Sequence, residues 1–69
     1  MSDKVFKLVE LTGTSEKSLE DAIQNAVAKA AKTVRQLRWF EVIETRGSID
    51  DDKVKQWQVT VKIGFALED

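Results

Sequence analysis

The chain has 69 residues and balances 11 basic against 12 acidic side chains, which gives a net charge of −1. The charges are interspersed, which disfavours the basic stripe typical of nucleic-acid binders. Cysteine, histidine and tyrosine are absent, so disulfides, common zinc sites and the usual nucleophile–base pairs of enzymes cannot be built. We therefore expect one small domain over residues 1–69 that is not an enzyme and gains stability by oligomerisation.

Membrane and secretion signals are also missing from the sequence. No apolar run approaches the roughly 20 residues that span a bilayer. Residues 1–4 lack the apolar segment of a signal peptide. We expect a cytoplasmic protein that binds neither membranes nor nucleic acid.

The first half of the chain predicts a strand followed by a helix. Residues 5–11 are rich in β-branched and aliphatic side chains and favour a strand, and residues 12–15 favour a turn. Ser18 and Asp21 fit a capping box at the start of a helix, with Ser15 as an alternative earlier cap. From about residue 18 to residue 36, apolar side chains recur at spacings of three and four, which is typical of an amphipathic helix. Several of them are alanines, which would let a sheet approach the helix axis closely.

The second half predicts two more strands, over residues 38–46 and 53–67, joined by a hairpin turn at the acidic residues 50–52. In the last strand, apolar side chains occupy every second position from Trp57 to Leu67. Alternation of this kind places one face of the strand on a core. The sequence therefore predicts an α+β fold in the order β-α-β-β.

The predicted helix is too short to cover the predicted last strand. A helix over residues 18–36 is roughly 28 Å long, whereas a continuous strand over residues 53–67 is roughly 45 Å long. Either the strand curls tightly around the helix, or neighbouring subunits cover the rest of its apolar face. The second possibility predicts an obligate oligomer.

The direction of Trp39 carries most of the functional information. If Phe40 and Val42 face the helix, Trp39 points away from it, and by the alternation of the last strand so does Gln58. Three interpretations compete for this outward tryptophan. It packs in a subunit interface, or it stacks on a planar ligand whose edge is hydrogen-bonded by Gln58, or the parity is reversed and it fills the core.

Other unusual residues have simpler interpretations. Trp57 lies on the apolar side of the last strand and predicts core or interface packing. Arg46 fits a solvated cation at a strand end, on the helix-facing side by the same count of parity. Residues 50–52 lack the spaced oxygen ligands of a Ca²⁺ loop, and residues 11–15 lack the glycines and lysine of a phosphate loop. We therefore expect no metal site and no catalytic residues.

Three segments together resemble the dodecin family: VELTGTS at residues 9–15, RWFEV at residues 38–42 and QVTVKIGF at residues 58–65. The resemblance runs nearly end to end without an obvious gap. It implies a three-stranded antiparallel sheet partly wrapped around one amphipathic helix. It also implies that twelve such chains assemble into a hollow homododecamer with cubic symmetry.

The resemblance further implies that the ligand is a flavin, either FMN or riboflavin. In dodecins, flavins bind in pairs across a two-fold axis, stacked between symmetry-related tryptophans. Trp39 matches the stacking residue, Gln58 matches the residue that binds the edge of the flavin ring, and Arg46 matches a basic residue near the pocket. Since parity places Arg46 on the helix-facing side, it needs a strand twist, a bulge or a neighbouring subunit to reach the site.

Two positions depart from the dodecin pattern. Trp57 stands where related sequences often have tyrosine or histidine, and Ala66 stands where many bacterial members have arginine. The loss of that arginine leaves open whether FMN or riboflavin is preferred. The expected function is flavin storage or sequestration, with quenching that protects the cell. The alternatives are a structural or protein-binding shell without flavin, a carboxylate-dependent enzyme that uses bound flavin, and a binder of another planar cofactor.

Overall fold

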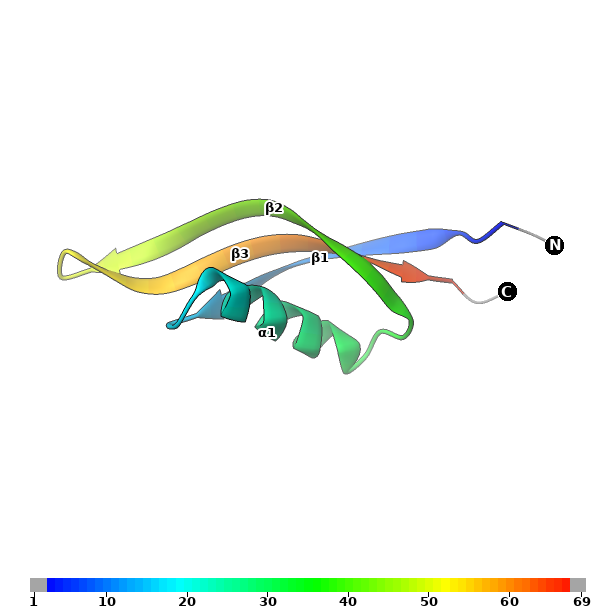
Figure 1. The fold of residues 1–69 in the computed structure, drawn as a ribbon, viewed down its shortest axis with the longest axis horizontal. Coiled ribbons are helices and arrows are strands. Elements are labelled where there is room, and N and C mark those ends of the chain that lie inside the picture. The colour runs from blue at the N-terminus through cyan, green and yellow to red at the C-terminus, as the bar shows by residue number, and fades with distance from the viewer. Residues whose placement is uncertain (1–2, 68–69) are drawn as a thin grey trace.

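The structure, a computed structural model, describes residues 3–67 as one helix and three strands (Figure 1). Strand β1 spans Phe6–Ser15, helix α1 spans Leu19–Ala31, strand β2 spans Leu37–Asp50 and strand β3 spans Lys53–Ala66. This order confirms the predicted β-α-β-β fold. The expectation that no signal peptide is present falls partly on residues 1–2, which lie outside the described residues.

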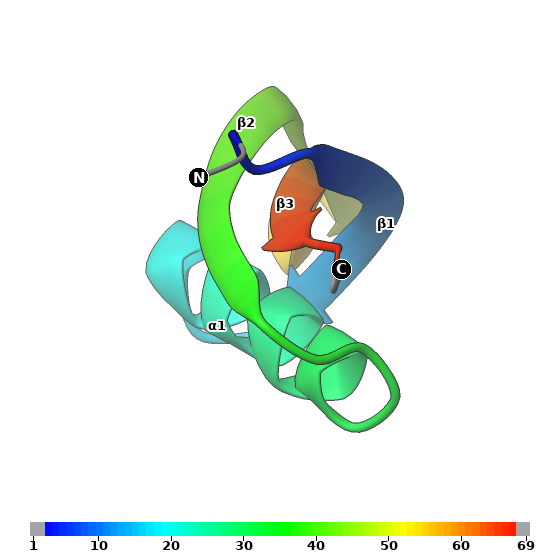
Figure 2. The ribbon, with the colours of Figure 1, turned by 90° about the vertical axis from the view of Figure 1, so that its right-hand side faces the viewer.

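The three strands form one antiparallel sheet in the order β1-β3-β2, so β3 lies in the centre. Strands β1 and β2 run in the same direction on either side of it, and α1 makes the crossover between them on one face of the sheet (Figure 1). Seen end-on, the strands curve over the helix (Figure 2). This confirms a three-stranded antiparallel sheet partly wrapped around one helix.

Helix α1 begins where the sequence predicts. The Ser18 hydroxyl accepts a hydrogen bond of 3.0 Å from the Asp21 backbone N–H, which confirms Ser18 as the N-cap. The Asp21 carboxylate accepts a hydrogen bond of 2.7 Å from the Ser15 hydroxyl, while the Ser18 N–H donates to Ser15 Oγ at 3.4 Å. Ser15 therefore supports the turn before the helix, and only half of the predicted capping box forms.

The helix ends at Ala31, and the prediction that it extends to Gln36 was wrong. The β-branched residues Thr33 and Val34 follow its last turn, and both backbone N–H groups donate to the Ala30 carbonyl at 3.2 and 2.9 Å. Gln36 then adopts a left-handed φ of 64° and its carbonyl accepts a hydrogen bond from the Ala66 N–H at 3.1 Å. The chain has to reverse here to bring β2 alongside β3.

Strand β1 extends to Ser15, so the predicted turn at residues 12–15 was also wrong. Gly13, which favoured the turn, instead lies directly under the helix. A Cβ at this position would overlap the Ala22 carbonyl oxygen and lie 2.9 Å from the Ala26 Cβ. The glycine is therefore a point of close approach between strand and helix, and the alanines of α1 allow that approach as predicted.

Strands β2 and β3 form a long hairpin around a two-residue turn. β2 continues past its predicted end at residue 46 to Asp50, and β3 begins at Lys53. Asp51 and Asp52 both have positive φ, of 53° and 62°, which is the conformation of a type I′ turn. The acidic run therefore forms the hairpin turn that the sequence predicts.

The core lies between α1 and the helix-facing side of β3. Its buried residues are Val59, Val61 and Ile63 on the strand and Ala22, Ala26 and Ala30 on the helix. Burying these aliphatic side chains supplies the main stabilisation of the fold within one chain.

Much apolar surface remains uncovered in a single chain. Helix α1 packs against β1 and β3, so Phe40 and Val42 of β2 are 49% and 42% exposed, although they lie on the helix-facing side opposite Ile63 and Val61. Ile49 and Val54, near the hairpin turn, are 74% and 56% exposed. The chain is 57 Å long, whereas the helix spans about 20 Å. The predicted mismatch between helix and sheet is therefore present.

Candidate functional site

Trp39 lies on the face of the sheet that is turned away from α1. It pairs with Gly64 of β3, and Gly64 follows Ile63, which is buried against the helix. Successive residues of a strand point to opposite faces, and cross-strand partners share a face. Trp39 therefore points outward as predicted, and the interpretation of Trp39 as core filling is excluded.

The indole of Trp39 lies flat on the sheet. A Cβ built on Gly64 would come within 2.7 Å of the indole Cδ2 atom and closer still to Cε2 and Cζ2. Three contiguous ring atoms at similar distances can only belong to a ring whose face covers the glycine. Phe6 of β1 contacts the same indole edge-to-face, with ring centroids 5.0 Å apart and an interplanar angle of 63°. The opposite face of the indole is turned outward, and Trp39 is 43% exposed.

A β-bulge in β2 decides the position of Arg46. The register with β3 shifts between Val42 and Glu44, so Ile43 is an extra residue. One inserted residue exchanges the faces of all positions beyond it. Arg46 consequently lies opposite Gln58 on the outer face. The count that placed Arg46 on the helix-facing side was wrong, because an unbroken alternation does not allow for the bulge.

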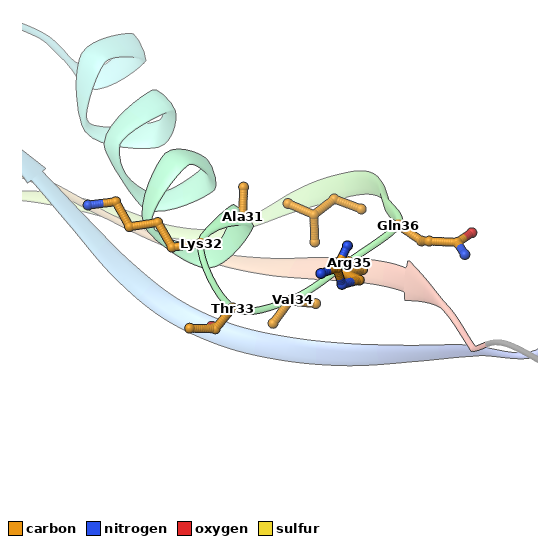
Figure 3. A pocket seen from close by; sticks show the side chains of 7 residues that line it. Ala31, Lys32, Thr33, Val34, Arg35 and Gln36 are labelled. Carbon is orange, nitrogen blue, oxygen red and sulfur yellow. The ribbon is translucent and has the colours of Figure 1, made fainter.

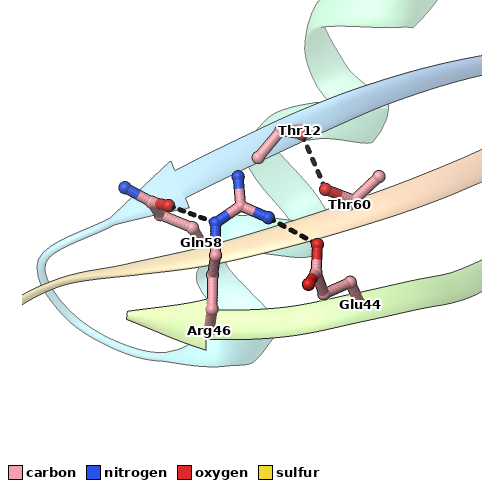
Figure 4. A network of polar contacts seen from close by, with 5 residues as sticks. All are labelled: Thr12, Glu44, Arg46, Gln58 and Thr60. Carbon is pink, nitrogen blue, oxygen red and sulfur yellow. Dashed lines mark hydrogen bonds and ion pairs between the residues drawn. The ribbon is translucent and has the colours of Figure 1, made fainter. Parts of the chain in front are cut away.

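Arg46 and Gln58 belong to a chain of hydrogen bonds on this outer face (Figure 4). Arg46 Nε donates to Gln58 Oε1 at 2.7 Å, and Arg46 Nη1 donates to Glu44 Oε1 at 2.7 Å. Gln58 Nε2 donates to Gln56 Oε1 at 3.0 Å. These bonds fix the orientation of the Gln58 amide, which keeps a second amide hydrogen.

The ion pair in this chain contributes little to stability. The side chains of Arg46 and Glu44 are 46% and 60% exposed, and exposed pairs contribute about 0.2–1 kcal/mol. Its main effect is to orient the guanidinium group and, through it, the Gln58 amide.

Within one chain, Trp39 lies apart from Arg46 and Gln58. Trp39 lies opposite Gly64, and Gly64 is six residues (64 − 58) from Gln58 along β3. That spacing corresponds to about 20 Å. A ring system stacked on Trp39 does not extend that far, so the structure brings Arg46 and Gln58 together but leaves Trp39 at a separate point of the same face.

This fold recurs in known proteins. The dodecin family profile matches residues 5–68 of the sequence. The chain belongs to the dodecin family. A dodecin from Thermus thermophilus is 58% identical over 66 residues, which cover 96% of each chain.

Solved structures give the same result. The crystal structure of a Thermus thermophilus protein has a TM-score of 0.93 and 57% identity, and the match covers 97% of this chain and 98% of that one. A dodecin from Streptomyces coelicolor has a TM-score of 0.94 and 45% identity, with 100% and 99% of the two chains covered.

The two departures from the dodecin pattern lie in different parts of the fold. Ala66 lies opposite Phe6, at the Trp39 end of the sheet, and is 6% exposed. It brings no charge to that end. Trp57 lies opposite Gly47, on the helix-facing side of β3, and is half-buried. Its position fits the packing role predicted for it and keeps it off the face that carries Trp39.

Sequence reasoning missed several residues of this dodecin surface. Phe6 and Gly64 hold the indole, and Glu44 and Gln56 extend the hydrogen bonds of Arg46 and Gln58. Only Gly64 left a signal in the sequence, because a glycine inside an otherwise regular strand marks a close approach. The other contacts depend on strand pairing, which the sequence does not display.

A hollow of about 670 Å³ lies elsewhere in this dodecin, at the loop between α1 and β2 (Figure 3). Residues 31–37 line it, and none of the three predicted site residues is among them. Across residues 3–67, no group of three or more acidic, histidine or cysteine side chains is arranged to hold a metal ion. Over the same residues, no helix is long and apolar enough to cross a membrane.

Proposed function

We propose that this dodecin stores or sequesters a flavin, FMN or riboflavin, by stacking the flavin ring on the outward face of Trp39. The observation that carries this proposal is the indole lying flat on Gly64 with its other face turned outward. A flat aromatic surface held in this way suits a planar ligand, and stacking contributes about 0.5–1.5 kcal/mol beyond the burial of area.

The proposed site is completed by other copies of the chain. About 20 Å of β3 separates Gln58 from the Trp39 position, so a flavin stacked on one Trp39 would meet Gln58 and Arg46 of a neighbouring subunit. We propose that the chain, as a single dodecin domain over residues 1–69, assembles into a hollow homododecamer in which two-fold-related Trp39 side chains enclose a pair of flavins. The exposed apolar side chains of Phe40, Val42, Ile43, Ile49 and Val54 support this assembly.

Gln58 and Arg46 are proposed to bind the polar parts of the ligand. The second amide hydrogen of Gln58 suits an acceptor on the edge of the flavin ring. Arg46 keeps part of its guanidinium exposed and suits an anionic or carbonyl group. Arg46 is therefore the residue that we expect to distinguish FMN, which carries a phosphate, from riboflavin, which does not.

Storage in the cytoplasm, without turnover, is the role that we propose. Stacking on both faces of the flavin would leave no room for a substrate beside the ring. It would also place an electron-rich indole against the flavin, so electron transfer from Trp39 would quench the excited state and protect the cell from flavin photochemistry.

The test is a pair of fluorescence titrations, of riboflavin and of FMN, with the unsubstituted protein and with Trp39→Ala. We expect strong quenching by the unsubstituted protein and a loss of affinity of about 10- to 100-fold in Trp39→Ala, since one stacked aromatic contributes about 1–3 kcal/mol. Native mass spectrometry in parallel should show the same number of subunits in the assembly of both proteins.

Two results would contradict the proposal. Absence of quenching by the unsubstituted protein would favour a shell without flavin or a binder of another planar cofactor. The second result is that the Trp39→Ala protein dissociates into smaller species that still bind flavin. This result would assign Trp39 to a subunit interface.

A further inference from the structure

Gly64 interrupts the pattern of β3 at the point where Trp39 lies over it. Glycine inside a strand costs conformational entropy and offers no side chain to pack, so its presence calls for a local reason. Here any Cβ would lie 2.7 Å or less from three atoms of the indole. Non-bonded carbon atoms pack at about 3.5–4.0 Å, so any other residue at position 64 would displace the ring.

Two contacts from different strands define the seat of the indole. Gly64 of β3 contacts the inner face of the ring, which lies directly on it. Phe6 of β1 contacts the ring from the side, with the two ring centroids 5.0 Å apart and an interplanar angle of 63°. A ring held on one face and at one edge keeps a fixed depth and tilt, and only its outer face remains available to a ligand.

We propose that Gly64 is a positioning residue of the stacking site, which sets the depth at which the Trp39 indole lies on the sheet. This inference rests on the proposed flavin binding, since the depth of the indole determines whether two rings and their partners can stack without a gap. Gly64 itself does not contact the flavin, because the indole lies between them.

A double-mutant cycle measures this role. Gly64→Ala should weaken riboflavin binding about tenfold, because the added methyl group lifts and tilts the indole. In a Trp39→Ala background the same change should have no further effect on affinity. The matched control is Gly47→Ala, also a glycine in a strand, where the nearest non-neighbouring atom to an added Cβ is the Gln56 carbonyl oxygen at 3.1 Å. This control should bind riboflavin like the unsubstituted protein.

A second measurement needs no flavin. The chain has two tryptophans, so Trp57→Phe leaves Trp39 as the single emitter. In that background Gly64→Ala should shift the Trp39 emission to longer wavelength and increase its quenching by acrylamide, because the ring leaves its seat. If Gly64→Ala alone fails to assemble, we expect the double variant Gly64→Ala/Trp39→Ala to assemble, because no indole then lies over position 64.

The outcomes separate this inference from the proposed function. Unchanged affinity and unchanged emission in Gly64→Ala would overturn the positioning role, as would an affinity loss of the same size in the Trp39→Ala background. An assembly failure that Trp39→Ala does not restore would overturn it too. If the unsubstituted protein binds no flavin but the emission of Gly64→Ala shifts, the proposed function fails while the seat of the indole stands.

Discussion

The two faces of β3 are built from alternating residues of one strand, yet they differ in what covers them. On the helix-facing side, Val59, Val61 and Ile63 are at most 1% exposed and pack on the alanines of α1. On the outer side, the side chain of Trp39 covers Gly64, and Gln58 contacts side chains of its own hairpin. One face packs on the helix. The other carries polar and aromatic groups that the helix does not cover, and on that face Thr60 and Ala66 are 8% and 6% exposed.

Because of this difference, the positions of β3 that stabilise the fold alternate with the positions that belong to the candidate binding site. From Val59 to Ile63 the odd-numbered positions of β3 pack on the helix, whereas the even-numbered positions Gln58 and Gly64 belong to the candidate site. Substitutions one residue apart should therefore have different effects, one on the free energy of unfolding and the other on ligand affinity. A strand of this kind can change its ligand surface without rebuilding its core.

The largest effect is expected on the helix-facing side, from Ile63→Ala. Removal of this buried side chain should lower the free energy of unfolding by about 2–5 kcal/mol. Chemical denaturation at a fixed protein concentration measures it, because the stability of an oligomer depends on concentration. The control is Lys62→Ala on the outer face, with an expected change within about 0.5 kcal/mol. If Ile63→Ala and Lys62→Ala lowered the free energy of unfolding equally, the two faces of β3 would not differ in their contribution to stability.

A smaller effect is expected on the outer face, from Arg46→Ala. Loss of the exposed cation should weaken FMN binding about fivefold, as expected for roughly 1 kcal/mol, and riboflavin binding less. The difference between the two flavins should shrink at 1 M salt, because salt screens exposed charges. Fluorescence titrations at low and high salt check this. An equal loss for both flavins would mean that Arg46 acts by orienting Gln58 and not through its charge.

The smallest effect is expected from Thr60→Val, also on the outer face. The change removes the 2.8 Å hydrogen bond between the Thr12 and Thr60 hydroxyl groups (Figure 4). It should lower the free energy of unfolding by about 0.2–1 kcal/mol, well below the loss in Ile63→Ala. Adding Thr12→Val should recover part of this loss, because no hydroxyl then lacks its partner. A loss as large as that of Ile63→Ala would show that the outer face also carries the fold.

Local periodicity was enough to predict the elements that form the core. The strict alternation of β3 and the alanine-lined face of α1 each repeat over short distances, and both elements formed as expected. Prediction failed where the chain changes direction. The helix ended at Ala31 because the β-branched residues after it and the reversal at Gln36 outweigh helical periodicity. Gly13 proved to be a close contact with α1 instead of a turn.

The sequence by itself determined the order of the elements and, through three short motifs, the resemblance to the dodecin family, while it left the outward direction of Trp39 as one of three interpretations. Only the tertiary structure decided that Arg46 lies beside Gln58, that Gly64 seats the indole, and that Trp39 is about 20 Å from Gln58 along β3. The physical reason is that these features depend on how strands pair. The extra residue at Ile43 exchanges the faces of the rest of β2, and nothing in the local sequence of that segment marks it.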